Sequence, residues 1–333
     1  MKRLVAALTL AAAGAVAGLL LTQGAASAAN ARTGIVDVNT NLGYQNSAAA
    51  GTGMVLTSSG IVLTNNHVIR GATTIRVVDP STHRTYTATV LGYDPAADVA
   101  VLKLKGAANL KTVTLGDSSK VRRGDAVTAI GNAGGTGVLT AASGTITGLQ
   151  RTITASDGDV SEQLSGLIET DAALQPGDSG GPLVDASGRV IGMDTAASSG
   201  FYFQSGASDA YAIPINRAVT IAKQIQSGHS ATAHIGATAF LGVSVQASGY
   251  DQNGTFVSGA LVMTVVPGSP AESAGLVPGD LITAFNGSSI SSTTALAGFV
   301  LDQSPGANVQ LTWIDQAGNQ QAATVALATG PPQ

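Results

Sequence analysis

The chain has 333 residues, of which 44% are hydrophobic, 11% are charged and 42 are glycine, and its formal net charge is −4. This length accommodates two ordinary domains, and the glycine-rich, weakly charged composition favours a β-rich protein with many turns. The net charge gives no basic surface for nucleic acid, and the lack of cysteine excludes disulfides, thiolate metal ligands and thiol catalysis.

Residues 1–31 have the pattern of an export signal. Two basic residues precede an apolar run over 4–21, and small-residue cleavage sites follow at 26–28 and 29–31. An uncleaved membrane anchor is the alternative, because a run of this length is close to the minimum for a membrane span. The polar residues at 22–24 favour cleavage. We therefore expect a secreted, periplasmic or cell-envelope protein.

Residues 32–228 are expected to form one domain of short strands. A helical pattern with proline at its start and glycine at its end covers 214–228 and is expected to end the domain. Strand follows strand without alternating helices, which favours a sandwich or barrels over βαβ units. The strands are expected within 51–64 (two strands around a Ser-Ser-Gly turn) and at 74–78, 85–91, 99–104, 126–132, 138–149, 166–170, 183–185, 189–195 and 211–213.

His67 and Asp98 are the first candidate catalytic residues. His67 follows the end of an apolar strand, and its ordinary pKa lets it exchange a proton near neutral pH. Asp98 opens an apolar run and needs a buried partner there. A buried aspartate that accepts the Nδ1–H of His67 would fix the histidine tautomer. The alternatives are a packed structural histidine and a turn aspartate, although Asp94, before a proline, fits the turn role better.

Ser179 lies in Gln175–Leu183 (QPGDSGGPL), flanked by three glycines. Glycine permits backbone dihedrals and close chain approaches that other residues do not. The N–H groups of Gly177 and Ser179 can then point at one spot, where negative charge would develop on a carbonyl oxygen. The alternative is an ordinary Gly/Ser surface turn.

The three motifs together resemble a known family. His67 in TNNHV, Asp98 in DPAADVAVLKL and Ser179 in QPGDSGGPL occur in the order of the chymotrypsin-like proteases. TNNHV and the FLGV segment around Gly242 narrow the resemblance to the HtrA/DegP branch, and within it to secreted, single-PDZ actinobacterial proteases. It covers roughly residues 33–330. It implies a mainly β fold, a chymotrypsin-like double six-stranded β-barrel followed by a PDZ domain, with the site between the barrels.

The resemblance also implies the role of each residue. Ser179 would be the nucleophile, His67 the general base and then the acid, and Asp98 the residue that orients His67. The backbone N–H groups of Gly177 and Ser179 would form the oxyanion hole. No metal and no cofactor are expected.

Near Ser179, two residues depart from the pattern of the HtrA family, and a third predicts the substrate preference. Many HtrA proteins have asparagine where this chain has Asp178 and Asp194. By the same resemblance, Ala173, six residues before Ser179, corresponds to the base of the S1 pocket of trypsin-like enzymes. An apolar base has no carboxylate to pair with arginine or lysine, so we expect cleavage after small or medium aliphatic residues. The remaining predicted substrate contacts are Asp194, Thr195 and Ala196.

Residues 229–238 read as a linker and 239–330 as a small β-sandwich with two helices, resembling a bacterial PDZ domain. A peptide C-terminus would add as a strand beside 241–245, near a helix over 293–301. Its carboxylate would meet backbone N–H groups of Leu241, Gly242 and Val243. The alternative is an appendage that binds nothing. The other expected elements are strands at 240–245, 261–266, 309–314 and 321–327 and a helix at 270–275.

The sequence therefore predicts an exported serine endopeptidase that acts on proteins or peptides and binds peptide C-termini at its PDZ domain. The alternative is a chaperone-like or peptide-binding scaffold with latent proteolysis. A homotrimer is a further expectation by resemblance, because HtrA proteins commonly associate through an N-terminal aromatic patch. Tyr44 is the one aromatic candidate before the first barrel.

Overall fold

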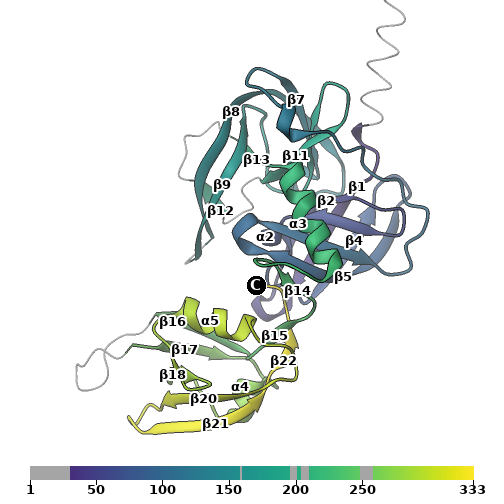
Figure 1. The fold of residues 1–333 in the computed structure, drawn as a ribbon. Coiled ribbons are helices and arrows are strands. Elements are labelled where there is room, and N and C mark those ends of the chain that lie inside the picture. Colours follow the sequence, from purple (N-terminus) through teal and green to yellow (C-terminus); the bar gives the residue numbers. More distant parts are fainter. Residues whose placement is uncertain (1–30, 158–159, 196–200, 204–209, 248–257) are drawn as a thin grey trace, which may run out of the picture. The chain divides into compact units, whose positions relative to one another are not determined.

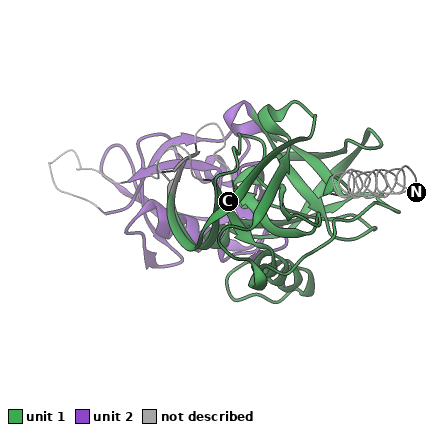
Figure 2. Cartoon of the chain, turned by 90° about the horizontal axis from the view of Figure 1, so that it is seen from above, with its two compact units in different colours: residues 1–41, 48–69, 74–233 green, residues 42–47, 70–73, 234–333 purple. Residues whose placement is uncertain are grey.

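The computed structural model describes residues 31–157, 160–195, 201–203, 210–247 and 258–333. The chain divides into two compact units (Figure 2). Unit 1 consists of Met1–Asn41, Ala48–Ile69 and Thr74–Ala233, and unit 2 of Leu42–Ser47, Arg70–Thr73 and His234–Gln333. Most of residues 1–31, the predicted export signal, lies outside the described residues. Among the residues that are described, no helix is long and apolar enough to cross a membrane.

The first half of unit 1 is a closed barrel (Figure 1). Its strands pair in the order β5-β4-β1-β2-β3-β6, and β5 also pairs with β6, so the sheet closes on itself. Their inward side chains, among them Met54, Leu63 and Val101, are buried in one apolar core. The strands are β1 (Ile35–Leu42), β2 (Ser47–Val55), β3 (Ile61–Thr64), β4 (Thr74–Asp79), β5 (Arg84–Asp94) and β6 (Val99–Leu104).

The second half of unit 1 repeats this architecture. The order is β8-β7-β10-β11-β13-β9, closed by pairing of β8 with β9, and β12 (Phe201–Phe203) adds to β8 outside the closed sheet. The six barrel strands are β7 (Ala126–Gly131), β8 (Thr140–Asp157), β9 (Val160–Thr170), β10 (Pro182–Asp185), β11 (Val190–Thr195) and β13 (Ala210–Pro214). The predicted mainly β, double-barrel fold is confirmed.

Helices in unit 1 are few. The amphipathic helix α3 (Ile215–Ser227) buries Ile215, Ala218, Ile221, Ala222 and Ile225, packs against β5, β6, β11 and β13, and ends at Gly228 with φ 76°. A single turn, α2 (Asn66–Ile69), follows β3 after Asn65 and carries His67. The short 3-10 turns are η1 (Gly43–Gln45), η2 (Pro95–Ala97), η3 (Ser118–Lys120) and η4 (Ala133–Gly135).

Unit 2 contains the second domain, the one expected to resemble a PDZ domain. Its main sheet has the order β16-β17-β18-β20-β21, with β19 beside β18, and β15 pairs with β22. Ser269 and Ser292 cap the two helices by accepting the backbone N–H groups of Glu272 and Ala295. The elements are β14 (His234–Ile235), β15 (Thr238–Phe240), β16 (Val243–Ala247), β17 (Ala260–Val265), α4 (Pro270–Ala274), β18 (Leu281–Phe285), β19 (Ser288–Ser289), α5 (Thr293–Leu301), β20 (Asn308–Ile314), β21 (Gln320–Ala326) and β22 (Ala328–Gly330).

One strand prediction was wrong, and several strands of the structure, among them β1, β12 and β18, were not predicted. The expected continuous strand over 240–245 is broken, because Gly242 has φ 88° and a Cβ at this position would overlap the Ser269 side chain. β1 was not predicted, because Asp37, Asn39 and Asn41 interrupt its apolar pattern. The side chain of Asp37 is nevertheless buried. The structure also extends β8 and β9 beyond the expected 138–149 and 166–170.

Candidate active site

His67 is held by Asp98 through both its ring and its backbone. Nδ1 of the ring lies 2.9 Å from Oδ2 and 3.1 Å from Oδ1 of Asp98, and each side chain is 2% exposed. The backbone N–H of His67 donates to Asp98 Oδ1 at 3.0 Å. The one-turn helix α2 therefore presents the histidine with its Nδ1 directed at a buried carboxyl group. This is the contact that the sequence predicts.

Asp98 is itself fixed by residues that the sequence does not place beside it. The Asn65 side-chain amide donates to the Asp98 carbonyl at 2.9 Å, and the Thr195 hydroxyl donates to Asp98 Oδ2 at 3.0 Å. Asp98 has φ 52° at the end of η2, whose first turn is capped by Asp94, the residue expected in that role. Thr195 stands on β11, so this bond joins the two barrels at the site.

Ser179 lies between a strand of the first barrel and a strand of the second. Its carbonyl accepts the Thr52 N–H of β2 at 2.8 Å. The next residue, Gly180, donates its N–H to the Asp194 carbonyl of β11 at 2.9 Å. Gly180 has φ 84°, and a Cβ there would overlap the Thr52 carbonyl. A glycine is therefore required after Ser179, because the backbones meet without room for a side chain.

Gly51 brings the serine loop next to the histidine turn. A Cβ on Gly51 would lie 2.7 Å from the Val68 side chain and 3.2 Å from the Ser179 carbonyl oxygen. Val68 directly follows His67, and Ser179 is 1% exposed. The structure thus gathers the segments of His67, Asp98 and Ser179 around the junction of the barrels.

The peptide that precedes Gly177 has a fixed orientation. The Pro176 carbonyl accepts the Gly134 N–H at 2.7 Å. In a trans peptide the N–H points opposite to the carbonyl, so the Gly177 N–H is directed away from Gly134. On the other side, the Gly177 carbonyl accepts the Thr52 hydroxyl at 2.7 Å, and that hydroxyl accepts the Asn132 N–H at 2.9 Å. Thr52 is therefore a clamp on this loop.

The peptide that precedes Ser179 is held in the same way. The Asp178 carbonyl accepts the Gly181 N–H at 2.9 Å, which directs the Ser179 N–H to the opposite side. Both amide groups predicted to bind the oxyanion thus have defined orientations. Sequence reasoning did not find Thr52, Asn65 or Asn132, because a hydroxyl or amide far along the chain carries no local signal of its partner.

Two buried carboxyl groups belong to this loop and to the strand beside it. Asp178 is 4% exposed and Asp194 is 0% exposed. Burial raises the pKa of Asp178, although the Gln175 N–H donates to its Oδ2 at 2.9 Å and opposes the shift. Burial, and then the nearby charge of Asp178, raise the pKa of Asp194 well above its ordinary value. Burial without a hydrogen-bond donor among the described residues thus shifts Asp194 towards its protonated form.

The predicted S1 residues are distributed unevenly. Ala173 is exposed, whereas Asp194 and Thr195 are fully buried, and the Thr195 hydroxyl contacts Asp98. Ala196 lies outside the described residues. Their contacts with substrate therefore stay predictions.

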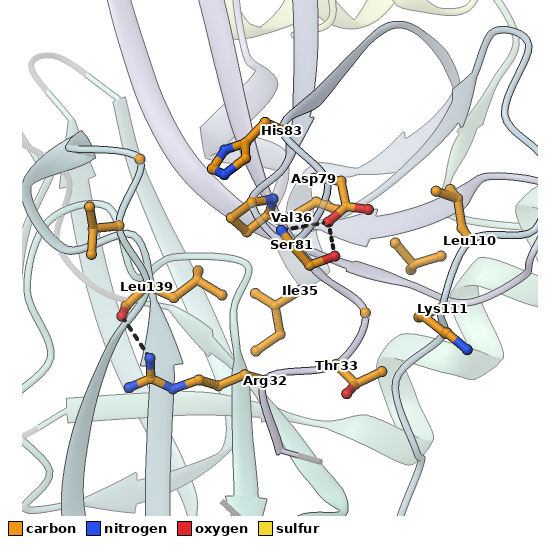
Figure 3. Close-up of a pocket in the computed structure, with 15 residues that line it drawn as sticks. Arg32, Thr33, Ile35, Val36, Asp79, Ser81, His83, Leu110, Lys111 and Leu139 are labelled. Atoms are coloured by element: carbon orange, nitrogen blue, oxygen red, sulfur yellow. Dashed lines mark hydrogen bonds between the residues drawn. The ribbon is translucent and has the colours of Figure 1, made fainter. Parts of the chain in front are cut away.

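A cavity of about 720 Å³ occupies another part of unit 1 (Figure 3). The Arg32 guanidinium donates to the Leu139 carbonyl at its edge, and Asp79 accepts the N–H and hydroxyl of Ser81. Its lining includes none of the three predicted triad residues, so this cavity does not mark the catalytic centre.

In unit 2, the predicted carboxylate-binding segment is anchored from both sides. The Leu241 carbonyl accepts the Ala271 N–H of α4, and the Gly242 carbonyl accepts the Val266 N–H, each at 2.9 Å. Val243 begins β16, which packs beside α5. On α5, Phe299 is half-buried and stacks on Phe285 with ring centroids 6.1 Å apart.

The fold and these contacts define a trypsin-like peptidase domain with a PDZ domain. Residues 51–193 match the family model of the trypsin-like peptidase domain, and residues 261–315 match that of the PDZ domain. The chain belongs to the HtrA-type serine proteases. It is 30% identical to the solved structure of the HtrA-type protease AlgW with a tripeptide, covering 92% of this chain and 98% of that one, with a TM-score of 0.51.

Curated relatives agree with this family. The chain is 36% identical over 282 residues to a probable DegP-like periplasmic serine endoprotease of Chlamydia muridarum, covering 80% of this chain and 52% of the relative. It is 34% identical over 312 residues to the serine protease PepD of Mycobacterium tuberculosis, covering 88% of this chain and 63% of the relative. The chain thus spans about half to two thirds of the length of these relatives.

Proposed function

We propose that this protein is an exported serine endopeptidase in which Ser179, His67 and Asp98 form the catalytic triad. The observation that carries the proposal is the bond of 2.9 Å between His67 Nδ1 and Asp98 Oδ2 at the barrel junction where the Ser179 loop also lies. Asp98 accepts the Nδ1–H, which leaves Nε2 as the basic nitrogen. This tautomer suits a general base.

The reaction follows from these roles. Ser179 Oγ attacks the peptide carbonyl as its proton passes to His67 Nε2, and the Gly177 and Ser179 N–H groups stabilise the oxyanion. The imidazolium then gives its proton to the leaving amine, which leaves an acyl group on Ser179. Water, activated by the same nitrogen, hydrolyses that ester and regenerates the serine.

The direct test is casein hydrolysis by the wild type and by Ser179→Ala, with Ser187→Ala as the matched control at an exposed serine of the same domain. We expect Ser179→Ala to abolish hydrolysis and Ser187→Ala to retain it. Equal hydrolysis by all three proteins would end the proposal. Suppression of client aggregation by wild type and Ser179→Ala alike, without cleavage by either, would instead support the scaffold alternative.

We further propose that S1 accepts small or medium aliphatic side chains. The support is Ala173, which offers an apolar and exposed side chain rather than a carboxylate. Peptides that differ only in valine or arginine at P1 test this preference. Comparable kcat/KM values for the two peptides would contradict it.

The PDZ domain is proposed to bind peptide C-termini by strand addition to β16. The support is the anchored Leu241–Gly242 segment beside α5. Fluorescence titration of one peptide as the free acid and as the C-terminal amide tests the carboxylate contact, because the two peptides differ in that group alone. Equal affinities would contradict it.

Export and assembly complete the proposal. The periplasmic names of relatives support export, and mass measurement of the secreted protein would show whether residues 1–31 are removed. For the homotrimer, Tyr44 is 53% exposed but already stacks on Phe240 within unit 2, with centroids 5.1 Å apart. Sedimentation of the wild type and Tyr44→Ala would show whether this ring contributes to an oligomer.

A further inference from the structure

Asp178 and Asp194 are two buried acids whose backbones both bond to Gly181. Both oxygens of Asp194 and Oδ1 of Asp178 are buried without a hydrogen-bond partner among the described residues. Two ionised carboxylates in such a site would repel each other in surroundings that screen charge poorly. Something must supply a hydrogen-bond donor, and the simplest donor is a proton on one of the acids.

The contacts of Asp178 and Asp194 connect both residues directly to the catalytic loop. Asp178 stands between Gly177 and Ser179, the two residues whose N–H groups are proposed to bind the oxyanion. Its side chain lies on Gly131 of β7, where an added Cβ would be 2.6 Å from Oδ1. The Asp194 backbone bonds to Gly180 and Gly181 through its carbonyl and its N–H. A movement of either carboxyl group therefore acts on the loop itself.

The two acids differ in which one is suited to hold the proton. Asp178 receives a backbone N–H from Gln175, which stabilises a carboxylate. Asp194 receives no such donor in the described part of the chain and is completely buried. The neutral acid is therefore Asp194, and its O–H is the one donor that this pair of side chains can provide.

We propose that Asp178 and Asp194 carry a single proton between them in the working enzyme, and that Asp194 is thereby a positioning residue for the oxyanion loop. This inference rests on the proposed protease function and deepens it. Loss of the proton at alkaline pH creates two buried negative charges, which push Asp178 out of place. The Gly177 and Ser179 N–H groups move with it, so kcat falls while substrate affinity changes less.

Few other ionisable groups adjoin the pair. β2 and β7 contain none, β10 carries Asp185, which pairs with Arg189, and β13 contributes Tyr211, opposite Thr195. His67 and Asp98 lie on the far side of Thr195. An alkaline loss of activity that comes from the acid pair is therefore distinguished by variants of the pair itself, which leave all of these groups intact.

The experiment compares kcat and KM from about pH 5 to about pH 10 for the wild type, Asp194→Asn, Asp194→Leu and the exposed control Asp125→Asn. The asparagine amide donates a hydrogen bond at every pH. We therefore expect Asp194→Asn to keep its activity at alkaline pH, where the wild type and Asp125→Asn lose about tenfold. Asp194→Leu cannot donate and should lose about tenfold in kcat at neutral pH, with KM within about threefold.

If kcat falls equally at alkaline pH in the wild type and Asp194→Asn, the inference is overturned, but the protease proposal is left intact. If no protein hydrolyses casein, the proposed function fails instead. Urea unfolding across the same pH range then decides the shared proton without any activity. A pH dependence that Asp194→Asn removes would support it, and parallel curves would overturn it.

Discussion

Asp98 and Asp194 are both buried aspartates near Ser179, 1% and 0% exposed, yet their surroundings are opposite. Asp98 accepts the backbone N–H and ring Nδ1 of His67 and the hydroxyl of Thr195. Among the described residues, no group donates a hydrogen bond to the carboxyl group of Asp194. A buried carboxylate is stable where donors converge on it, whereas one without donors favours the neutral acid. Burial alone therefore does not tell which chemical role an aspartate has.

The largest expected effect comes from removing the charge of Asp98, the aspartate that accepts several hydrogen bonds. Asp98→Asn should lower kcat by about 10⁴-fold, because the amide presents the wrong partner to His67 Nδ1 and reverses the tautomer. Asp94→Asn, which alters a buried turn cap next to Asp98, should keep kcat within about tenfold. Initial rates of peptide hydrolysis give the kcat of both variants. Similar losses of kcat in the two variants would show that the substitutions disturb the fold rather than the contact with His67.

The next effect concerns the clamp on the oxyanion loop. Thr52→Val removes the hydroxyl that donates to the Gly177 carbonyl and accepts the Asn132 N–H, which leaves two buried groups unpaired. At about 1–3 kcal/mol for each group, we expect kcat to fall about a hundredfold with little change in KM. Thr52→Ser retains the hydroxyl and should recover most of the activity. A serine variant as impaired as the valine variant would contradict the clamp.

A smaller effect is expected where Asp98 loses one of its three donors. Thr195→Val removes the hydroxyl bonded to Asp98 Oδ2 and should reduce kcat about tenfold, because His67 and the backbone still hold the carboxylate. Thr195→Ser serves as the matched control. If Thr195→Val mainly raises KM instead, Thr195 acts through substrate binding, as the sequence predicts.

The smallest effect on activity is expected at neutral pH for Asp194→Asn, within about threefold, but its effect on stability depends on pH. Burial raises the pKa of Asp194 well above 3.8 in the folded protein, so the folded state binds a proton that the unfolded state releases. Stability from this group is complete below 3.8 and is lost as pH rises through the folded pKa. Urea unfolding should therefore show a weaker alkaline decline for Asp194→Asn than for the wild type. Equal declines would mean that Asp194 is not protonated when folded.

Much of the fold was predictable because its signals are local. Apolar strand patterns, glycine turns and the α3 pattern before Gly228 all lie in short stretches of chain. β1 escaped prediction because polar residues alternate through it and only the barrel shows that Asp37 is buried. The break at Gly242 depends on Ser269, 27 residues away, so no local pattern could reveal it.

The candidate site divides in the same way. The motifs around His67, Asp98 and Ser179 name the reacting groups, because each chemistry requires a particular residue type in a recognisable context. The supporting residues Thr52, Asn65 and Thr195 could not be found, because serine, threonine and asparagine are common in this chain and a hydroxyl has no preferred partner in sequence.

By itself, the sequence determined the residue types: a histidine, two kinds of aspartate context, a serine among glycines, and the order in which they occur. Only the tertiary structure decided which aspartate receives donors and which receives none. The reason is physical. The charge state of a buried carboxyl group depends on the few atoms within hydrogen-bonding distance, and folding brings those atoms from strands that are far apart along the chain.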